Sequence, residues 1–104
     1  ELHTFSSLNE AFLKEYHGAM EKADIAMVYF NPNTIAHKKL APVSVAQVNE
    51  AFAKKDLIVF TDSGLMKQEL LAMNFEQSVV LLMSSGNFDG LSLEALAEEI
   101  VHQS

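Results

Sequence analysis

Three nearly continuous apolar runs constrain the fold of this chain more than any other feature of its sequence. They are IAMVYF at 25–30, LIVFT at 57–61 and SVVLLM at 78–83. A strand with one face in water alternates apolar and polar residues, whereas a parallel strand covered on both faces is apolar throughout. The runs therefore predict buried parallel strands, and ELHTF at 1–5 is a candidate for the end of a fourth.

Amphipathic patterns separate these runs. They predict a helix over 8–23, capped by Ser6 or Ser7, and further helices beginning at Ser44, at Asp62 or Ser63, and at Ser92. The residues expected to face inward are Leu8, Phe12, Ala19, Ala23, Val48, Phe52, Met66, Leu70, Met73, Leu93, Leu96, Ala97 and Ile100. Strands alternating with helices form parallel sheets through right-handed crossovers. We therefore predict an α/β fold: one Rossmann-like three-layer domain over 1–104, its mostly parallel sheet covered by helices on both faces.

One connection is longer than the others. The stretch NPNTIAHKKLAPV at 31–43 contains two prolines and no clear helical pattern, so we expect a loop there. Loops of this length in compact domains are often functional.

Composition excludes several classes of function. The chain has 104 residues, no cysteine and a net charge of −7, and all its positive charges are lysines. Thiolate chemistry is therefore absent from this sequence, and an acidic chain without a basic patch predicts no nucleic-acid partner. No apolar run reaches the roughly 20 residues that span a bilayer, so we also expect no membrane partner. The chain does not begin with Met, and we expect it to be a piece of a longer protein.

Polar segments follow each predicted strand, at 3–7, 31–34, 61–64 and 84–90. The carboxyl ends of parallel strands meet at one edge of a sheet, where ligands of open α/β sheets gather. The same residue types also serve as helix caps and turns. The turn SSGNFDG at 84–90 therefore remains open to both interpretations, as does His3.

The motifs of several enzyme classes are missing. The chain contains no GxGxxG, no GxxxxGK[ST] and no GxSxG, and its histidines show no metal-binding spacing. Asp62 and Asp89 are candidate acids, but capping and turn formation explain them equally well. From the residues alone we predict no catalytic residue and no metal site within this chain.

Two stretches nevertheless resemble a known family. In the first, His3, Phe5 and Ser6 match a strand-to-helix pattern of the alanine-adding branch of the Mur ligases, the ATP-dependent ligases of peptidoglycan assembly. In the second, MSSGNFDG is similar to the Met-Ser-x-Gly-x-Phe-x-Gly turn of the murein peptide ligase branch; the matching residues are Met83, Ser84, Gly86, Phe88 and Gly90. The chain therefore resembles the C-terminal domain of the Mur ligase family over nearly its whole length. It differs at Thr4 and Ser7, where the alanine-adding pattern has arginines.

The resemblance implies a bacterial cytoplasmic enzyme of three domains, of which this chain is the third. Such an enzyme joins UDP-N-acetylmuramate to L-alanyl-γ-D-glutamyl-meso-diaminopimelate through an acyl phosphate, using ATP and Mg²⁺ bound outside this chain. The third domain helps to bind the incoming peptide, and by itself it is expected to be inactive. The residues implied in peptide binding are His3, Thr4, Ser6, Ser84, Ser85, Gly86 and Asn87.

Two alternatives remain open. The acceptor could be L-alanine rather than the tripeptide, which would make the parent enzyme biosynthetic. The chain could also be a free-standing Rossmann-like interaction module without catalytic activity.

Overall fold

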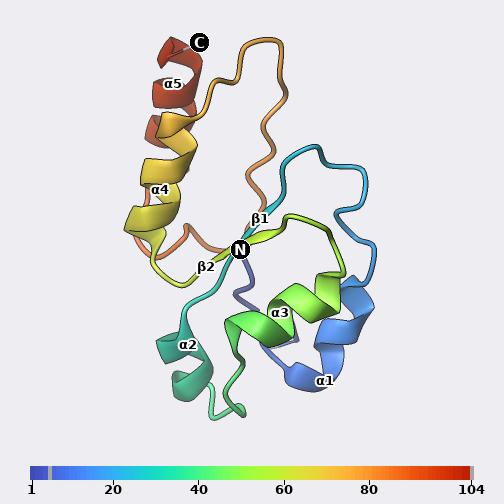
Figure 1. Ribbon diagram of the computed structural model, residues 1–104. Coiled ribbons are helices and arrows are strands. Elements are labelled where there is room, and N and C mark those ends of the chain that lie inside the picture. Colours follow the sequence, from blue (N-terminus) through green and yellow to red (C-terminus); the bar gives the residue numbers. More distant parts are fainter. Residues whose placement is uncertain (5, 104) are drawn as a thin grey trace.

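A two-stranded parallel sheet lies at the centre of the structure, a computed structural model that describes residues 1–4 and 6–103 (Figure 1). Strand β1 (Met27–Tyr29) pairs with β2 (Ile58–Phe60), with Val28 opposite Val59. Leu2 forms a further parallel bridge to Phe30 on the other side of β1. Parallel strands are therefore confirmed within the predicted runs at 25–30 and 57–61, but each has three residues and β2 is only half-buried. ELHTF contributes one bridge residue.

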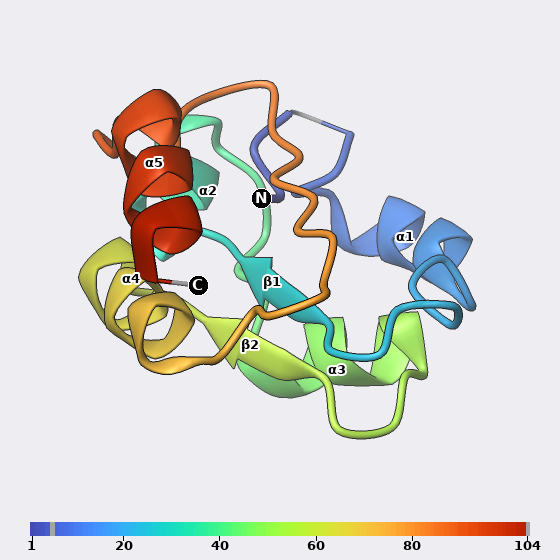
Figure 2. The same cartoon turned by 90° about the horizontal axis from the view of Figure 1, so that it is seen from above.

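The helices lie on both sides of this sheet, as Figures 1 and 2 show. They are α1 (Glu10–Leu13), the 3-10 helix η1 (Lys14–Tyr16), α2 (Pro32–His37), α3 (Val45–Phe52), α4 (Ser63–Ala72) and α5 (Leu93–Gln103). Each is too short or too polar to span a lipid bilayer, within the part of the chain that the structure describes. The arrangement is a small mixed α/β fold.

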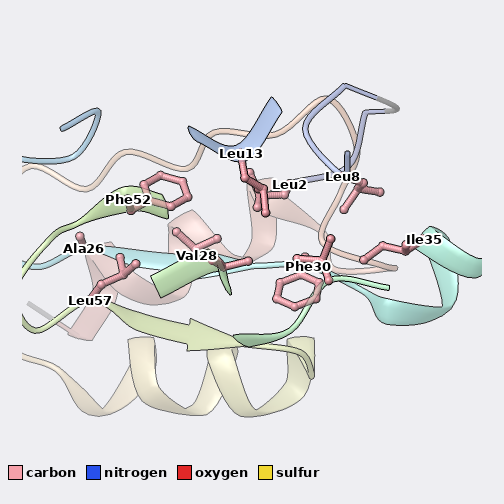
Figure 3. Close-up of a cluster of buried hydrophobic side chains, with 11 residues drawn as sticks. Leu2, Leu8, Leu13, Ala26, Val28, Phe30, Ile35, Phe52 and Leu57 are labelled. Atoms are coloured by element: carbon pink, nitrogen blue, oxygen red, sulfur yellow. The ribbon is translucent and has the colours of Figure 1, made fainter. Parts of the chain in front are cut away.

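Two buried clusters separate along the strands because successive side chains point to opposite faces. Val28 and Phe30 belong to the first cluster, drawn in Figure 3, together with side chains from the N-terminal segment, α1, α2 and α3. Tyr29 belongs to the second cluster, with side chains from α4 and α5. Both faces of β1 are therefore covered, which is why its sequence is apolar throughout.

Three of the predicted helix starts are confirmed by their caps. Ser44 and Gln47 form a reciprocal capping box at α3, and the Asp62 carboxylate accepts hydrogen bonds from the first turn of α4. The Ser92 hydroxyl accepts a hydrogen bond from Ala95 N at 3.2 Å. Of the side chains predicted to face inward on α5, Leu96 and Ile100 are buried, but Ala97 is exposed.

The predicted helix over 8–23 is wrong in its length and its cap. Asn9, rather than Ser6 or Ser7, caps α1. Helical structure ends after Tyr16, and Gly18 adopts φ 76° with its N–H donated to Phe52 O of α3 at 3.2 Å. A left-handed glycine ends a helix, and this tertiary hydrogen bond holds the turn against α3. Phe12, predicted to face inward, is 41% exposed.

The predicted loop at 31–43 contains a helix, so that prediction is also wrong. Asn31 caps α2 with its side chain, and Pro32 occupies the first turn, where its missing N–H costs no hydrogen bond. Buried Ile35 anchors the helix to the first cluster. The Asn-Pro pair therefore marks a helix start here rather than a loop.

The run SVVLLM at 78–83 does not form the predicted buried strand. Val80 and Leu82 pack against the second cluster, but Val79, Leu81 and Met83 are 88%, 74% and 63% exposed. No strand of the described residues includes any part of this run. Its described backbone hydrogen bonds lie at its two ends: Ser78 N donates to Phe75 O at 3.0 Å, and Met83 O accepts from the amino group of Glu1 at 2.8 Å. The run keeps the alternation of a strand, but only one of its faces is covered.

Packing of α5 should carry a large part of the stability of the second cluster. Leu96 is 2% exposed, so Leu96→Ala should lower the free energy of unfolding by about 2–5 kcal/mol through lost burial and a residual cavity. Urea unfolding monitored by circular dichroism measures the change. Leu65→Ala on α4 is the matched control, because Leu65 is 56% exposed and its loss should cost less than about 0.5 kcal/mol. Equal losses in the two variants would contradict the packing described.

Candidate functional site

Four polar segments meet at one edge of the sheet, three of them brought there by parallel pairing. β1 leads through Phe30 into Asn31, β2 leads into Asp62 at the start of α4, and Leu2 leads into His3. The turn 84–90 reaches the same edge through the Met83–Glu1 hydrogen bond. The candidate site is therefore the strand-end edge, defined by residues 1–4, 29–31, 62–63 and 84–90.

Glu1 ties the turn to the N-terminal segment. Its Oε1 accepts a short hydrogen bond from the Ser84 hydroxyl and a second, at 3.1 Å, from the backbone N–H of Phe88. The Ser84 oxygen in turn accepts from Gly86 N at 2.8 Å. The Glu1 side chain is only 1% exposed. The buried Glu1 carboxylate thus binds both ends of residues 84–88, the first part of the turn.

His3 lies directly against this part of the turn. Its Nδ1 is 3.8 Å from Oε2 of Glu1, and a Cβ atom added to Gly86 would come within 3.2 Å of His3 Cδ2. The same added atom would lie 3.3 Å from Glu1 Oε1. Gly86 is therefore a place of close approach where any side chain would crowd both the imidazole and the carboxylate.

The second part of the turn is tied to β1 by another carboxylate. Asp89 accepts a short hydrogen bond from the Tyr29 hydroxyl, and Asn31 Nδ2 donates to the same Asp89 oxygen at 3.1 Å. Burial raises the pKa of Tyr29 above its usual value, and the hydrogen bond and charge of Asp89, with the charge of Glu1, raise it further; a hydrogen bond with Ser63 acts in the opposite direction. Tyr29 is therefore a neutral hydrogen-bond donor at ordinary pH.

The backbone between these two anchors is strained. Phe88 and Asp89 have φ values of 54° and 57°, in the left-handed region that L-residues with side chains rarely adopt. Phe88 is 5% exposed and its ring packs against that of Tyr29, with centroids 6.0 Å apart. Strained residues persist where the surrounding structure fixes them, and they cluster at functional sites.

The structure brings together some of the predicted site residues and leaves others apart. His3, Ser84 and Gly86 meet around Glu1. The Thr4 hydroxyl instead donates to Ser7 Oγ at 2.9 Å, and Asn87 Oδ1 accepts from Gly90 N at 3.0 Å. Ser6 and Ser85 are exposed, and Phe5 of the family pattern lies outside the described residues.

Two residues of the site, Glu1 and Tyr29, were not predicted from the sequence. Nothing in the sequence distinguishes Glu1 from a solvated surface carboxylate. The sequence does hold a clue to Tyr29. A buried tyrosine normally has a hydrogen-bond partner for its hydroxyl, and this one lies two residues before the polar residue Asn31.

The arrangement favours binding over chemistry. The Ser84 hydroxyl donates its hydrogen bond to the Glu1 carboxylate rather than to the His3 imidazole, so these three residues do not form a Ser-His-acid arrangement. Among the described residues no group of three or more His, Asp or Glu could hold a metal ion. What the edge does offer is the His3 imidazole, the Ser85 hydroxyl and the Asn87 amide beside a turn of fixed shape.

Two surface hollows lie away from this edge. One, of about 410 Å³, is lined by Ala95, Glu98, Glu99 and His102 of α5. The other, of about 560 Å³, lies between the α1 region and residues 39–41. Neither is lined by a residue of the strand-end edge, where the side chains of Ser85, Asn87 and Asp89 are exposed.

Comparison with known proteins adds no assignment: no family model, curated protein or solved structure matches the chain.

The Tyr29–Asp89 pair predicts a loss of stability at alkaline pH. Above about pH 10 an unfolded tyrosine loses its proton, whereas folded Tyr29 keeps it because its pKa is raised. The folded state then binds more protons than the unfolded state, so the free energy of unfolding falls as pH rises, by at most about 1.4 kcal/mol per pH unit. Urea unfolding at pH values from about 8 to about 11 measures this slope.

Two variants assign the slope to this tyrosine. Tyr29→Phe should remove its contribution entirely, and Asp89→Asn should reduce it because the negative charge that raises the Tyr29 pKa is gone. An unchanged alkaline slope in Tyr29→Phe would contradict the assignment.

Proposed function

We propose that this chain is the C-terminal, peptide-binding domain of a bacterial cytoplasmic ligase of the Mur family. In this proposal the parent enzyme joins UDP-N-acetylmuramate to L-alanyl-γ-D-glutamyl-meso-diaminopimelate, and the chain has the Rossmann-like three-layer fold that the family implies. The observation that carries the proposal is the meeting of His3, Ser84 and Gly86, all residues of the family-like stretches, at the strand-end edge.

The order of segments across the sheet supports a binding role for this edge. Leu2 N donates to Tyr29 O on one side, while the amino group of Glu1 bonds Met83 O. The end of the 78–83 run therefore lies beside the N-terminal segment at Met83. In the three-layer fold proposed here, this run would extend the sheet and give the order β2, β1, residues 1–2, residues 78–83.

The proposed order would contain a topological switch point. From the N-terminal segment the chain proceeds outward through β1 to β2, and then returns to the other side at 78–83. Open α/β sheets bind ligands beyond the strand ends at the place where the order reverses. Here that place lies between His3 and the turn 84–90.

The chemistry assigned to this chain is binding and orientation of the acceptor. An amine that attacks an acyl phosphate needs alignment, and a correctly oriented reactant gains several powers of ten in rate over a free one. His3, Ser85 and Asn87 would supply hydrogen bonds to the incoming peptide beside the fixed backbone of the turn. An open edge suits a domain that closes over a substrate held by other domains.

ATP and Mg²⁺ belong elsewhere in this proposal. They supply the phosphoryl group and the charge neutralisation for acyl phosphate formation. The sequence contains no P-loop, and among residues 1–4 and 6–103 no acidic or histidine cluster fits a metal ion. No step of phosphoryl transfer is therefore assigned to residues of this chain.

A non-catalytic interaction module is the second candidate function. It is favoured by one observation, the exposure of Val79, Leu81 and Met83 along one face of the 78–83 run. Contiguous exposed apolar side chains often mark interaction surfaces. Under this alternative the strand-end edge would have no part in a reaction.

ADP release by the full-length parent protein separates these candidates. With UDP-N-acetylmuramate, ATP and Mg²⁺, turnover should appear on addition of the tripeptide. Turnover with L-alanine alone would move the parent to the biosynthetic branch. No turnover with either acceptor, in a preparation shown to be folded and to bind ATP, would contradict the ligase proposal.

Variants of the edge extend the same assay. His3→Ala and Asn87→Ala should each lower kcat/KM for the acceptor about tenfold, the effect of one lost hydrogen bond, without changing the KM for ATP. Asn74→Ala is the matched control, because Asn74 Oδ1 accepts from Glu76 N just as Asn87 Oδ1 accepts from Gly90 N, but outside the edge. Equal acceptor kinetics in all three variants would remove the edge from the proposal.

A further inference from the structure

We infer that Glu1 is the positioning residue of the strand-end edge, holding the turn 84–90 in the shape that presents His3, Ser85 and Asn87 to a ligand. The inference rests on the proposed function for the identity of the ligand, but its structural claim stands without it. No family pattern quoted above includes this position.

The first argument is the burial of the carboxylate. The Glu1 side chain is 1% exposed although it stands beside an open edge. Removing a charged group from water is costly unless hydrogen bonds replace the lost hydration. Here the Ser84 hydroxyl and the Phe88 N–H supply them, and His3 Nδ1 lies 3.8 Å from the other oxygen. A buried acceptor with donors from one short turn fixes that turn in place.

The second argument is the backbone strain downstream of this contact. Phe88 has φ 54°, an uncommon value for a bulky residue, and it is the residue whose N–H Glu1 binds. Asp89 follows at φ 57° and is anchored separately through Tyr29. Without the Glu1 side chain the turn would keep its β1 anchor and the buried Phe88 ring, but residues 84–87 would lose their side-chain contact with the N-terminal segment.

The third argument is that Glu1 links the 84–90 turn to the His3 side chain. Ser84 donates to Glu1 and accepts from Gly86 N, and Gly86 in turn packs against the His3 ring. A shift of the carboxylate therefore moves the turn and the imidazole together. Glu1 acts through these residues and needs no contact with a ligand.

The experiment uses three variants of Glu1 that distinguish the effect of its hydrogen-bond acceptor from the effect of its negative charge. The hydrogen bonds from Ser84 and Phe88 both end on Oε1, so Glu1→Gln keeps the acceptor and removes the charge. Glu1→Ala removes the acceptor, and Glu1→Asp withdraws it by one methylene. Glu10→Ala is the control, because Glu10 is an exposed carboxylate near the same end of the chain whose side chain bonds Gln47 instead.

Amide hydrogen exchange at Phe88, measured by NMR, is the primary readout. Exchange should accelerate about 10- to 100-fold in Glu1→Ala and Glu1→Asp, as expected for loss of a hydrogen bond to a charged group. It should change less than about threefold in Glu1→Gln and in Glu10→Ala. Wild-type exchange at Phe88 in Glu1→Ala would overturn the inference, as would equal acceleration in Glu1→Gln and Glu1→Ala.

If Glu1→Ala does not fold, the hydrogen bonds of the turn can be tested from the other side of the contact, at Ser84. Ser84→Ala removes one donor to Glu1 and the acceptor of Gly86 N, so exchange at Gly86 should accelerate about tenfold while amides of α3 remain as in the wild type. Unchanged exchange at Gly86 would overturn the inference by itself.

Acceptor kinetics in the parent ligase provide the functional readout. Glu1→Ala should raise the KM for the tripeptide about tenfold or more and leave the KM for ATP unchanged, whereas Glu1→Gln should restore most of the affinity. If the wild-type parent shows no ligase activity, the proposed function fails while the exchange data still decide the role of Glu1. If exchange responds but the tripeptide KM does not, Glu1 shapes the turn but positions nothing for the ligand, and the inference is overturned.

Discussion

Parallel pairing of β1 with β2 and of Leu2 with Phe30 determines where every other part of this structure can lie. Parallel strands all leave the sheet at the same edge, so each connection must return along a face before the next strand begins. The faces are thereby covered by helices, and the edge collects the polar residues that follow each strand. The candidate site is a consequence of this pairing rather than an addition to it.

Two carboxylates attach the 84–90 turn to its neighbours at that edge. Glu1 holds the first part of the 84–90 turn, and Asp89 ties the second part to Tyr29 and Asn31. Between them Phe88 is kept in a left-handed conformation with its ring buried against Tyr29. The turn is consequently attached both to the N-terminal segment and to β1.

The sequence predicted those elements that depend on local chemistry. The strands around Val28 and Val59 follow from continuous apolar runs, and the starts of α3, α4 and α5 follow from capping residues whose side chains make the expected hydrogen bonds. Such signals are contained in a few neighbouring residues. They need no knowledge of the rest of the fold.

The predictions that failed depend on contacts between distant residues. The helix over 8–23 is cut short where Gly18 bonds Phe52 of α3, and α2 forms in an expected loop because Ile35 finds a place in the first cluster. The run at 78–83 has the composition of a buried strand, but pairing depends on its neighbours, and its described backbone hydrogen bonds lie only at Ser78 and Met83. In the site, Glu1 could not be predicted for the same reason, since its donors are more than eighty residues away in sequence.

The central claim, that the N-terminal segment and the 84–90 turn form one surface, is tested most directly by a nuclear Overhauser effect between His3 and Gly86. A Cβ atom built on Gly86 would lie 3.2 Å from His3 Cδ2, so the Gly86 α-proton on that side faces the imidazole. We predict a strong cross-peak between this proton and the His3 Hδ2 proton in the wild-type chain. Its absence, in spectra that resolve both resonances and show the expected contacts within the two buried clusters, would contradict the account.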